Sequence, residues 1–183
     1  MKINEITEAW DVPNIKKKES GPGPVYQDEE HILQHNGKLI SKTSDGHLVY
    51  KTGNKGTSRI EYHAVNPITK TVDVSVDANE KNNVLTKILL VAAKDNTISA
   101  TDFYYHLIVN LNKVLVHDML SPGGKAVLKK LNTKYHAKIA THAWLHGQPL
   151  NLTDKDDEYV YGSGRETSEI RDAEDIELVT YKK

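Results

Sequence analysis

The sequence lacks cysteine, and of its aromatic residues one is phenylalanine, two are tryptophan and nine are tyrosine, in 183 residues. The absence of cysteine excludes disulfide bonds, thiolate catalysis and cysteine-based zinc sites. No apolar run approaches the roughly 18–20 residues that a membrane-spanning helix needs, since the longest covers residues 88–93. The residues after Met1 are polar, so we expect no secretory signal and a cytoplasmic location.

The net charge of −1 hides an uneven distribution along the chain. Residues 1–30 contribute −3, residues 31–152 contribute +7 and residues 153–183 contribute −5. A basic centre can attract polyanions such as nucleic acid. Aromatic and basic side chains are only thinly interleaved, however, as at Tyr50–Lys51. We therefore expect an ordinary solvated surface and no nucleic-acid partner.

Composition divides the chain into three parts. The Gly-Pro pairs at residues 21–24 can continue neither a helix nor a central strand, and they mark an N-terminal extension over residues 1–30. Residues 31–152 form the predicted domain. Residues 153–183 are acidic and contain the Gly162–Gly164 break, which predicts a C-terminal extension ending in a strand around residues 176–181. Such extensions are typical contact sites for protein partners, including other copies of the chain.

Period-two alternation predicts strands in the first half of the domain. Residues 47–51 and 59–65 flank a Gly-Asn-Lys-Gly turn and read as a hairpin. In residues 71–77 three valines alternate with polar residues, so the valines should face a core while Asp73 and Asp77 face water. This pattern is typical of an antiparallel sheet with one solvated face.

The second half of the domain predicts two buried strands, each followed by a capped helix. Residues 84–93 are nearly all apolar, as expected for a strand covered on both faces. Ser99 is the predicted N-cap of the first helix, with Asp102 as its capping-box partner. Residues 113–117 are the second strand, and Ser121–Pro122 begins a helix that should end near Asn132. Residues 135–144 and 150–152 complete the domain as strands.

This order of elements resembles the GNAT (Gcn5-related N-acetyltransferase) fold over Tyr50–Leu152. Three stretches strengthen the resemblance: residues 103–108, 114–118 and 121–125. The implied fold class is α/β (α+β), a mixed, mostly antiparallel sheet with two main helices plus the two extensions. The same stretches are similar to small GNAT-like proteins of tailed bacteriophages, which implies a place in the host cytoplasm or the virion.

The resemblance implies a site for acetyl-CoA or CoA after the first buried strand. In the family, backbone N–H groups at a helix N-terminus bind the pyrophosphate there. The corresponding residues of this chain are Asn96, Thr97, Ile98, Ser99, Ala100 and Thr101. Only Ala100 matches the family signature. Asp95 places a negative charge where a cation or amide is wanted, and Ile98 places a branched side chain where bare backbone is needed.

The candidate catalytic residues are few. The family's tyrosine general acid would fall near Leu128, which cannot donate a proton, so Tyr135 is the nearest substitute. His117 and Asp118 end a buried strand and are a second candidate, as a base with an orienting carboxylate. We expect no metal site, because His142 and His146 would lie about 13 Å apart along a strand, too far to share a metal ion.

Two functions are consistent with these observations. The first is a phage-type, non-catalytic GNAT-like protein that acts as a virion, assembly or accessory component through protein contacts. The second is an acyl-CoA-dependent N-acyltransferase with an unknown acceptor. The altered pyrophosphate signature favours the first.

Overall fold

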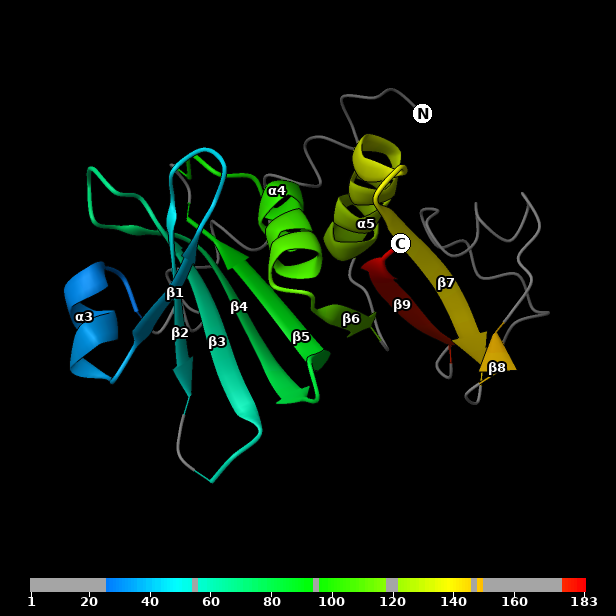
Figure 1. Cartoon of the computed structure of the whole chain (residues 1–183), viewed down its shortest axis with the longest axis horizontal. Helices are drawn as coiled ribbons and strands as arrows, with labels where there is room; N and C mark the ends of the chain where they lie inside the picture. The colour runs from blue at the N-terminus through cyan, green and yellow to red at the C-terminus, as the bar shows by residue number, and fades with distance from the viewer. Residues whose placement is uncertain (1–25, 54–55, 94–95, 118–121, 146–147, 150–175) are drawn as a thin grey trace. The chain divides into compact units, whose positions relative to one another are not determined.

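A computed structural model describes residues 26–53, 56–93, 96–117, 122–145, 148–149 and 176–183 (Figure 1). Contacts divide the chain into two compact units. Unit 1 comprises Met1–Ala78 and Leu89–Phe103, and unit 2 comprises Asn79–Ile88 and Tyr104–Lys183. The boundary between the units falls inside three elements, which are β4 (Val72–Lys81), β5 (Val84–Ala92) and α4 (Ala100–Tyr105).

The strands of unit 1 lie in the order β1-β2-β3-β4-β5. Neighbours β1 and β2 are antiparallel, as are β2 and β3. A short helix, α3, precedes them, and the Asp28 side chain caps it by accepting a hydrogen bond of 2.8 Å from the His31 N–H. Its buried Ile32 belongs to the core of the unit. The new elements are α3 (Glu29–Gln34), β1 (Lys38–Lys42), β2 (Leu48–Gly53) and β3 (Arg59–Val65).

The first half of β4 is buried on both faces, so the prediction that its aspartates face water is wrong for Asp73. Its valines are buried, as the alternation predicts. Asp73 and Ser75 point to the opposite face, yet they are only 3% and 5% exposed. Asp77 retains a side-chain exposure of 20% and pairs with the exposed Arg59. Because buried polar groups need partners inside the protein, Asp73 and Ser75 must be hydrogen-bonded.

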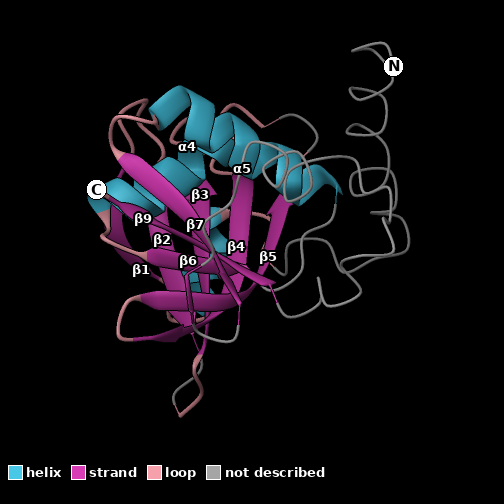
Figure 2. Ribbon diagram, turned by 90° about the vertical axis from the view of Figure 1, so that its right-hand side faces the viewer, coloured by secondary structure: helices cyan, strands magenta, loops and turns pink. Residues whose placement is uncertain are grey.

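The strands of unit 2 lie in the order β5-β6-β9-β7-β8. β5 and β6 are parallel, whereas β9 is antiparallel to both of its neighbours, and so is β8 to β7. Helix α5 packs on β7 (Figures 1 and 2). The elements are η2 (His106–Asn110), β6 (Val114–His117), α5 (Pro122–Tyr135), β7 (Ile139–Leu145), β8 (Gln148–Pro149) and β9 (Ile176–Lys182).

The core of unit 2 forms where α5 covers one face of its strands. The apolar side chains Val127, Leu128 and Leu131 of this helix are buried. They share the interior with buried residues of the strands, namely Leu115, Ile139, Ala143 and Leu178. The helix continues to Tyr135 rather than ending near Asn132, and β7 therefore begins later than predicted, at Ile139.

The predicted cap of the first main helix is confirmed. The Ser99 hydroxyl accepts from the Asp102 N–H at 3.1 Å and donates to the Asp102 carboxylate at 2.8 Å. The helix then changes from α to π geometry at His106. In this segment the Leu111 N–H donates to the His106 carbonyl, five residues back. This change was not predicted, because hydrophobic periodicity does not distinguish the two geometries over five residues.

The chain is thus α+β with a mostly antiparallel arrangement of strands, as predicted at this level of description. One strand differs from expectation, because β5 is not covered on both faces: Leu85 is fully buried, whereas Leu89 is 54% exposed. Residues 176–182, predicted within the C-terminal extension, form β9 between β6 and β7. Most of both extensions, and the predicted strand at residues 150–152, lie outside the described residues. No helix of the described residues is long and apolar enough to cross a membrane.

Candidate functional site

The loop between β5 and α4 contains the residues that the resemblance assigns to CoA. The Asn96 amide donates to the Ile98 carbonyl at 2.9 Å, which closes a tight turn. The Ile98 side chain is only 2% exposed, so it faces the interior of unit 1. Ser99 is the helix cap described above, and Ala100 and Thr101 are the first residues of α4. The loop is therefore held by contacts within the protein.

Thr97 is bound to the buried carboxylate of Asp73. Its N–H donates to Asp73 Oδ2 at 2.9 Å, and its hydroxyl donates to the same oxygen at 2.6 Å. The Asp73 side chain is 4% exposed, so both bonds lie largely out of water. Hydrogen bonds to a charged acceptor are stronger than neutral ones, and they fix the backbone of the loop here.

The imidazole of His47 completes this contact. Its Nε2 lies 3.1 Å from Asp73 Oδ2 and 2.8 Å from Thr97 Oγ1. The one hydroxyl proton of Thr97 is donated to Asp73, so Thr97 Oγ1 accepts a hydrogen bond from His47. Nε2 of His47 must therefore carry a proton. The Asn66 amide also donates to Thr97 Oγ1, at 3.1 Å.

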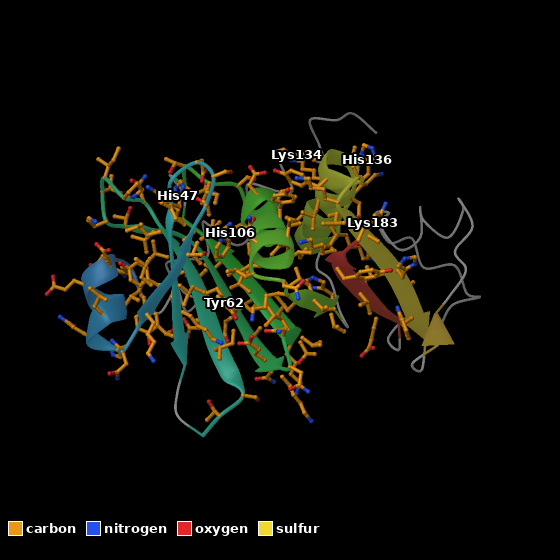
Figure 3. All side chains as sticks on the ribbon, in the orientation of Figure 1. His47, Tyr62, His106, Lys134, His136 and Lys183 are labelled. Carbon is orange, nitrogen blue, oxygen red and sulfur yellow. The ribbon has the colours of Figure 1, made fainter. Side chains whose placement is uncertain are left out.

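These residues come from four different strand ends of unit 1, and we refer to His47, Asn66, Asp73 and Thr97 as the His47 cluster. His47 comes just before β2, Asn66 follows β3, Asp73 lies at the start of β4 and Thr97 follows β5. Figure 3 labels His47 at this end of the strands. The cluster therefore ties together the loops at one end of the unit.

A tight turn between β1 and β2 positions His47. The His47 N–H donates to Thr43 Oγ1 at 2.9 Å, and the Thr43 N–H donates to the His47 carbonyl at 2.9 Å. Gly46 has a φ of 100°, which favours glycine. Asp45 in this turn lies 3.2 Å from His47 Nδ1. Burial opposes the charge of Asp45, but the hydrogen bond from Thr43 and the approach of His47 lower the pKa of this carboxyl below its ordinary value.

The sequence of groups Thr97, His47 and Asp45 has the composition of a nucleophile–base–carboxylate triad, but not its hydrogen bonding. In a triad the hydroxyl donates its proton to the imidazole. Here the hydroxyl donates to Asp73, and the imidazole donates to the hydroxyl. His47 Nδ1, which is buried, also lacks a hydrogen bond of good geometry to Asp45. The arrangement stabilises the loop and does not activate Thr97.

A second row of buried polar residues crosses the middle of unit 1. His63 Nε2 lies 3.1 Å from the Thr52 hydroxyl, and its Nδ1 lies 2.9 Å from the Ser75 hydroxyl. The ring of Tyr26 covers this row, with its centroid 5.1 Å from that of His63. Burial lowers the pKa of His63 to about 4, so the imidazole is neutral at physiological pH.

Of the predicted catalytic candidates in unit 2, His117 is buried and Tyr135 is packed against another aromatic ring. His117 is 4% exposed at the end of β6, and its ring lies 5.8 Å from that of Tyr104. Asp118 lies outside the described residues. Tyr135 stacks on Tyr105 with ring centroids 3.9 Å apart and also contacts the Lys134 ammonium. His117 and Tyr135 contact different tyrosines, Tyr104 and Tyr105 respectively.

Three further residues complete the comparison with the predicted site. Leu128 lies on α5 and is fully buried in the core. His142 is exposed on β7, and His146 lies outside the described residues. Within the described ranges, no group of three or more histidine, aspartate or glutamate side chains has the arrangement of a metal site.

Comparison of the chain with protein-family models, with curated proteins and with solved structures gives no match.

Proposed function

We propose that this chain is a non-catalytic interaction protein built on a GNAT-like fold. The observation that carries the proposal is the double hydrogen bond from Thr97 to the buried Asp73 carboxylate. The loop that would bind a CoA pyrophosphate uses one of its backbone N–H groups inside the protein. The resemblance to proteins of tailed phages favours a virion, assembly or accessory role.

Electrostatics supports the same conclusion. A pyrophosphate needs free N–H groups and positive charge around it. The Asp73 carboxylate of the His47 cluster contacts Thr97 in this loop, and the Asp45 carboxylate lies 3.2 Å from His47 Nδ1. An anion approaching Thr97 would meet repulsion from Asp73 and would have to break the bonds that Asp73 makes. The cost of leaving the buried carboxylate without donors opposes binding.

Exposed apolar side chains on unit 1 support the interaction part of the proposal. They are Leu33, Leu39, Ile40, Ile68 and Leu89, with exposures of 54%, 55%, 40%, 89% and 54%. Leu39 and Ile40 lie on β1, which comes first in the strand order and pairs only with β2 among the described strands. A terminal strand can bind a partner through its open backbone edge.

Calorimetric titration of the intact chain with acetyl-CoA, and separately with CoA, tests the non-catalytic part. We expect no heat of binding up to about 1 mM ligand, because the Thr97 N–H is engaged and Asp73 repels phosphate. Micromolar binding that is lost in Ser99→Asp or Ala100→Glu would overturn the proposal.

Sedimentation velocity tests the interaction part. The full chain should associate with itself or with a co-encoded partner, and the double change of Leu39→Lys and Ile40→Lys should weaken that association. Lys38→Gln, on the same strand, serves as the matched control. Association that is indifferent to the double change, in protein whose circular dichroism is unaltered, would remove β1 from the proposal.

One observation keeps the acyltransferase alternative open. β5 and β6 are parallel strands joined by a helical crossover, an arrangement in which α/β proteins often bind ligands. Their pairing covers only Val84 with Val114 and Leu85 with Leu115, and Lys87 then adopts a φ of 51°, which interrupts the regular strand. The titration with acetyl-CoA decides between this alternative and the proposed function.

A further inference from the structure

Helix α3 of unit 1 and its C-cap bring two histidines together on one side of the helix. His31 and His35 are four residues apart, a spacing at which side chains become neighbours on a helix. Their ring centroids are 5.0 Å apart, with an interplanar angle of 62°. His31 is half-buried and His35 is exposed, so a solute can reach the pair. We refer to these two residues as the α3 histidine pair.

A hydrogen bond to the helix backbone fixes the protonation of the His35 ring. Its Nδ1 lies 2.8 Å from the carbonyl oxygen of His31. A carbonyl oxygen can only accept, so Nδ1 must carry the proton of this bond. In the neutral imidazole the other nitrogen, Nε2, then has a lone pair and no proton. Histidines that bind metal ions are commonly oriented in this way, by donating their second ring N–H to a backbone carbonyl.

The backbone that carries the pair is held in place on both sides. The Asp28 carboxylate accepts from the His31 N–H at 2.8 Å, and the His35 N–H donates to the Ile32 carbonyl at 3.2 Å. Between the two histidines, the Ile32 side chain is fully buried in the core of the unit. The ring of Tyr26 packs against both imidazoles, with centroids 5.5 Å from that of His31 and 5.1 Å from that of His35. Such support reduces the conformational entropy that two side chains lose when they bind one ligand.

The separation of the two rings matches that of imidazoles that share one metal ion. A Zn–N bond of about 2.0–2.1 Å places the centre of an imidazole ring about 3.2 Å from the metal. Two such rings have centroids about 4.5–5.2 Å apart when the angle between them at the metal lies between a right angle and the tetrahedral angle. The observed separation of 5.0 Å falls within this range.

The charges near the pair favour a cation. Asp28, the N-cap of α3, and Glu30, in its first turn, are exposed acidic residues. The nearby Lys70 is balanced, because its Nζ lies 3.0 Å from the Glu29 carboxylate. Carboxylates close to an imidazole pair attract a divalent cation and oppose the binding of an anion.

We infer that the α3 histidine pair binds one divalent transition-metal ion of the Zn²⁺ class, with water in the remaining coordination positions. Imidazole nitrogen suits Zn²⁺, Ni²⁺ and Cu²⁺, whereas Mg²⁺ and Ca²⁺ prefer oxygen ligands. Among the described residues, no third histidine or carboxylate completes the site, so an ion held here keeps open positions. The inference departs from the sequence-based expectation of no metal site, which rested on the strand spacing of His142 and His146.

Calorimetric titration of the intact, tag-free chain with ZnCl₂ at neutral pH tests the inference. We expect one ion per chain, with a dissociation constant on the order of 10–100 µM, weaker than that of a structural site with four protein ligands. MgCl₂ should give no heat of binding up to about 10 mM, because Mg²⁺ requires oxygen ligands.

Substitutions on α3 test whether both histidines bind the same ion. His31→Ala and His35→Ala should each weaken Zn²⁺ at least about tenfold, because a single imidazole remains. His136→Ala removes an exposed histidine of unit 2 and should leave the affinity unchanged. If His35→Ala does not fold by circular dichroism, His31→Ala, which leaves the C-cap residue in place, tests the same pair.

A change of spacing separates chelation from the mere number of histidines. Leu33→His in the His35→Ala background keeps two histidines on the helix but places them two residues apart, where side chains do not face each other. This double variant should bind Zn²⁺ as weakly as His35→Ala does.

Three results would overturn the inference. The first is the absence of Zn²⁺ binding up to about 1 mM. The second is a His136→Ala variant that loses as much affinity as His31→Ala, which would make the binding adventitious. The third is recovery of the full affinity by Leu33→His in the His35→Ala background.

Discussion

Units 1 and 2 differ in how the two faces of their strands are covered. In unit 1, the face of β4 that the sequence predicts to be solvated is buried, and Asp73 and Ser75 find partners inside the protein. In unit 2, one face is covered by α5 while the other presents rings and valines to an open pocket. Unit 1 thus encloses the polar groups of β4 and exposes apolar side chains elsewhere, such as Leu39 and Ile68, whereas unit 2 presents half-buried valines on its open face.

Buried polar groups and exposed apolar groups have different roles. Buried polar groups that bond to one another are costly to disturb and fix one conformation. Exposed apolar and aromatic groups are available to a partner. A histidine–carboxylate–hydroxyl cluster is therefore not evidence of catalysis by composition alone, since the direction of each hydrogen bond decides what the cluster does.

The largest difference in the free energy of unfolding should be between substitutions of Asp73 and Asp77. The sequence predicts that both of these aspartates of β4 face water. Asp73→Ala removes the acceptor for the Thr97 N–H and hydroxyl and for His47, and should lower the free energy of unfolding by about 3–5 kcal/mol. Asp77→Ala removes an exposed ion pair with Arg59 and should cost about 1 kcal/mol or less. Urea denaturation measures both, and equal losses would contradict the burial of Asp73.

A second comparison tests two leucines, one on α5 and one on β5. Leu128→Ala should cost about 2–5 kcal/mol, because this side chain of α5 is fully buried and its loss leaves a cavity. Leu89→Ala on β5 should cost about 1 kcal/mol or less, because Leu89 is 54% exposed. Thermal unfolding followed by circular dichroism measures both. A large loss for Leu89→Ala would mean that β5 is covered in solution.

Acid should destabilise the protein through His63 in unit 1. Its folded-state pKa of about 4 lies below the ordinary value of 6.5, so the unfolded chain binds a proton that the folded protein excludes. The contribution of a neutral His63 is present above pH 6.5 and is lost as the pH falls towards 4, by on the order of 3 kcal/mol.

His63→Gln keeps polar atoms near Thr52 and Ser75 but cannot take up the proton. Stability measured by urea denaturation between pH 7 and pH 4 should fall less steeply in this variant than in the wild type. His136→Gln changes an exposed histidine of unit 2 and should leave the slope of the wild type unaltered. A slope that is the same in all three proteins would refute the buried, neutral state of His63.

The smallest changes in stability should come from substitutions on the two faces of β7. Thr141→Ala removes a hydroxyl that donates to the Asn132 amide oxygen at 2.9 Å and lies 2.9 Å from the Thr180 hydroxyl, at a cost of about 1 kcal/mol. His142→Ala, one residue along on the open face, should change stability by about 0.5 kcal/mol or less. Chemical denaturation resolves this difference, and the reverse order would place the core on the wrong face.

Local signals in the sequence predicted the elements that depend on near neighbours. The Ser99 cap and its Asp102 partner are three residues apart, and the helix from Pro122 begins at a proline that fits the first turn. Both are confirmed. The buried side of α5 follows from its periodicity, which is a property of the helix itself.

Contacts between distant residues were not predictable in this way. The His47 cluster joins residues 26 and 50 positions apart, and no local pattern identifies its members. Asp73 alternates with valines as a solvated residue would, and only the packing of other segments over β4 buries it. Likewise the apolar pattern of residues 176–181 indicates a strand. It does not indicate that this strand, β9, lies between β6 and β7. The GNAT-like family, the phage origin and the roles of Asn96–Thr101 stay predictions.

The Thr97 amide gives the most direct measurement of whether the loop after β5 is closed. Nitrogen-edited NMR spectra of the intact, labelled chain should show the Thr97 N–H exchanging slowly with solvent, and its signal should stay in place as acetyl-CoA is added to about 1 mM. Asp73→Asn, which weakens the acceptor, should speed the exchange. A Thr97 N–H that exchanges as fast as an exposed amide, or that shifts with acetyl-CoA, would contradict the closed loop and the non-catalytic function.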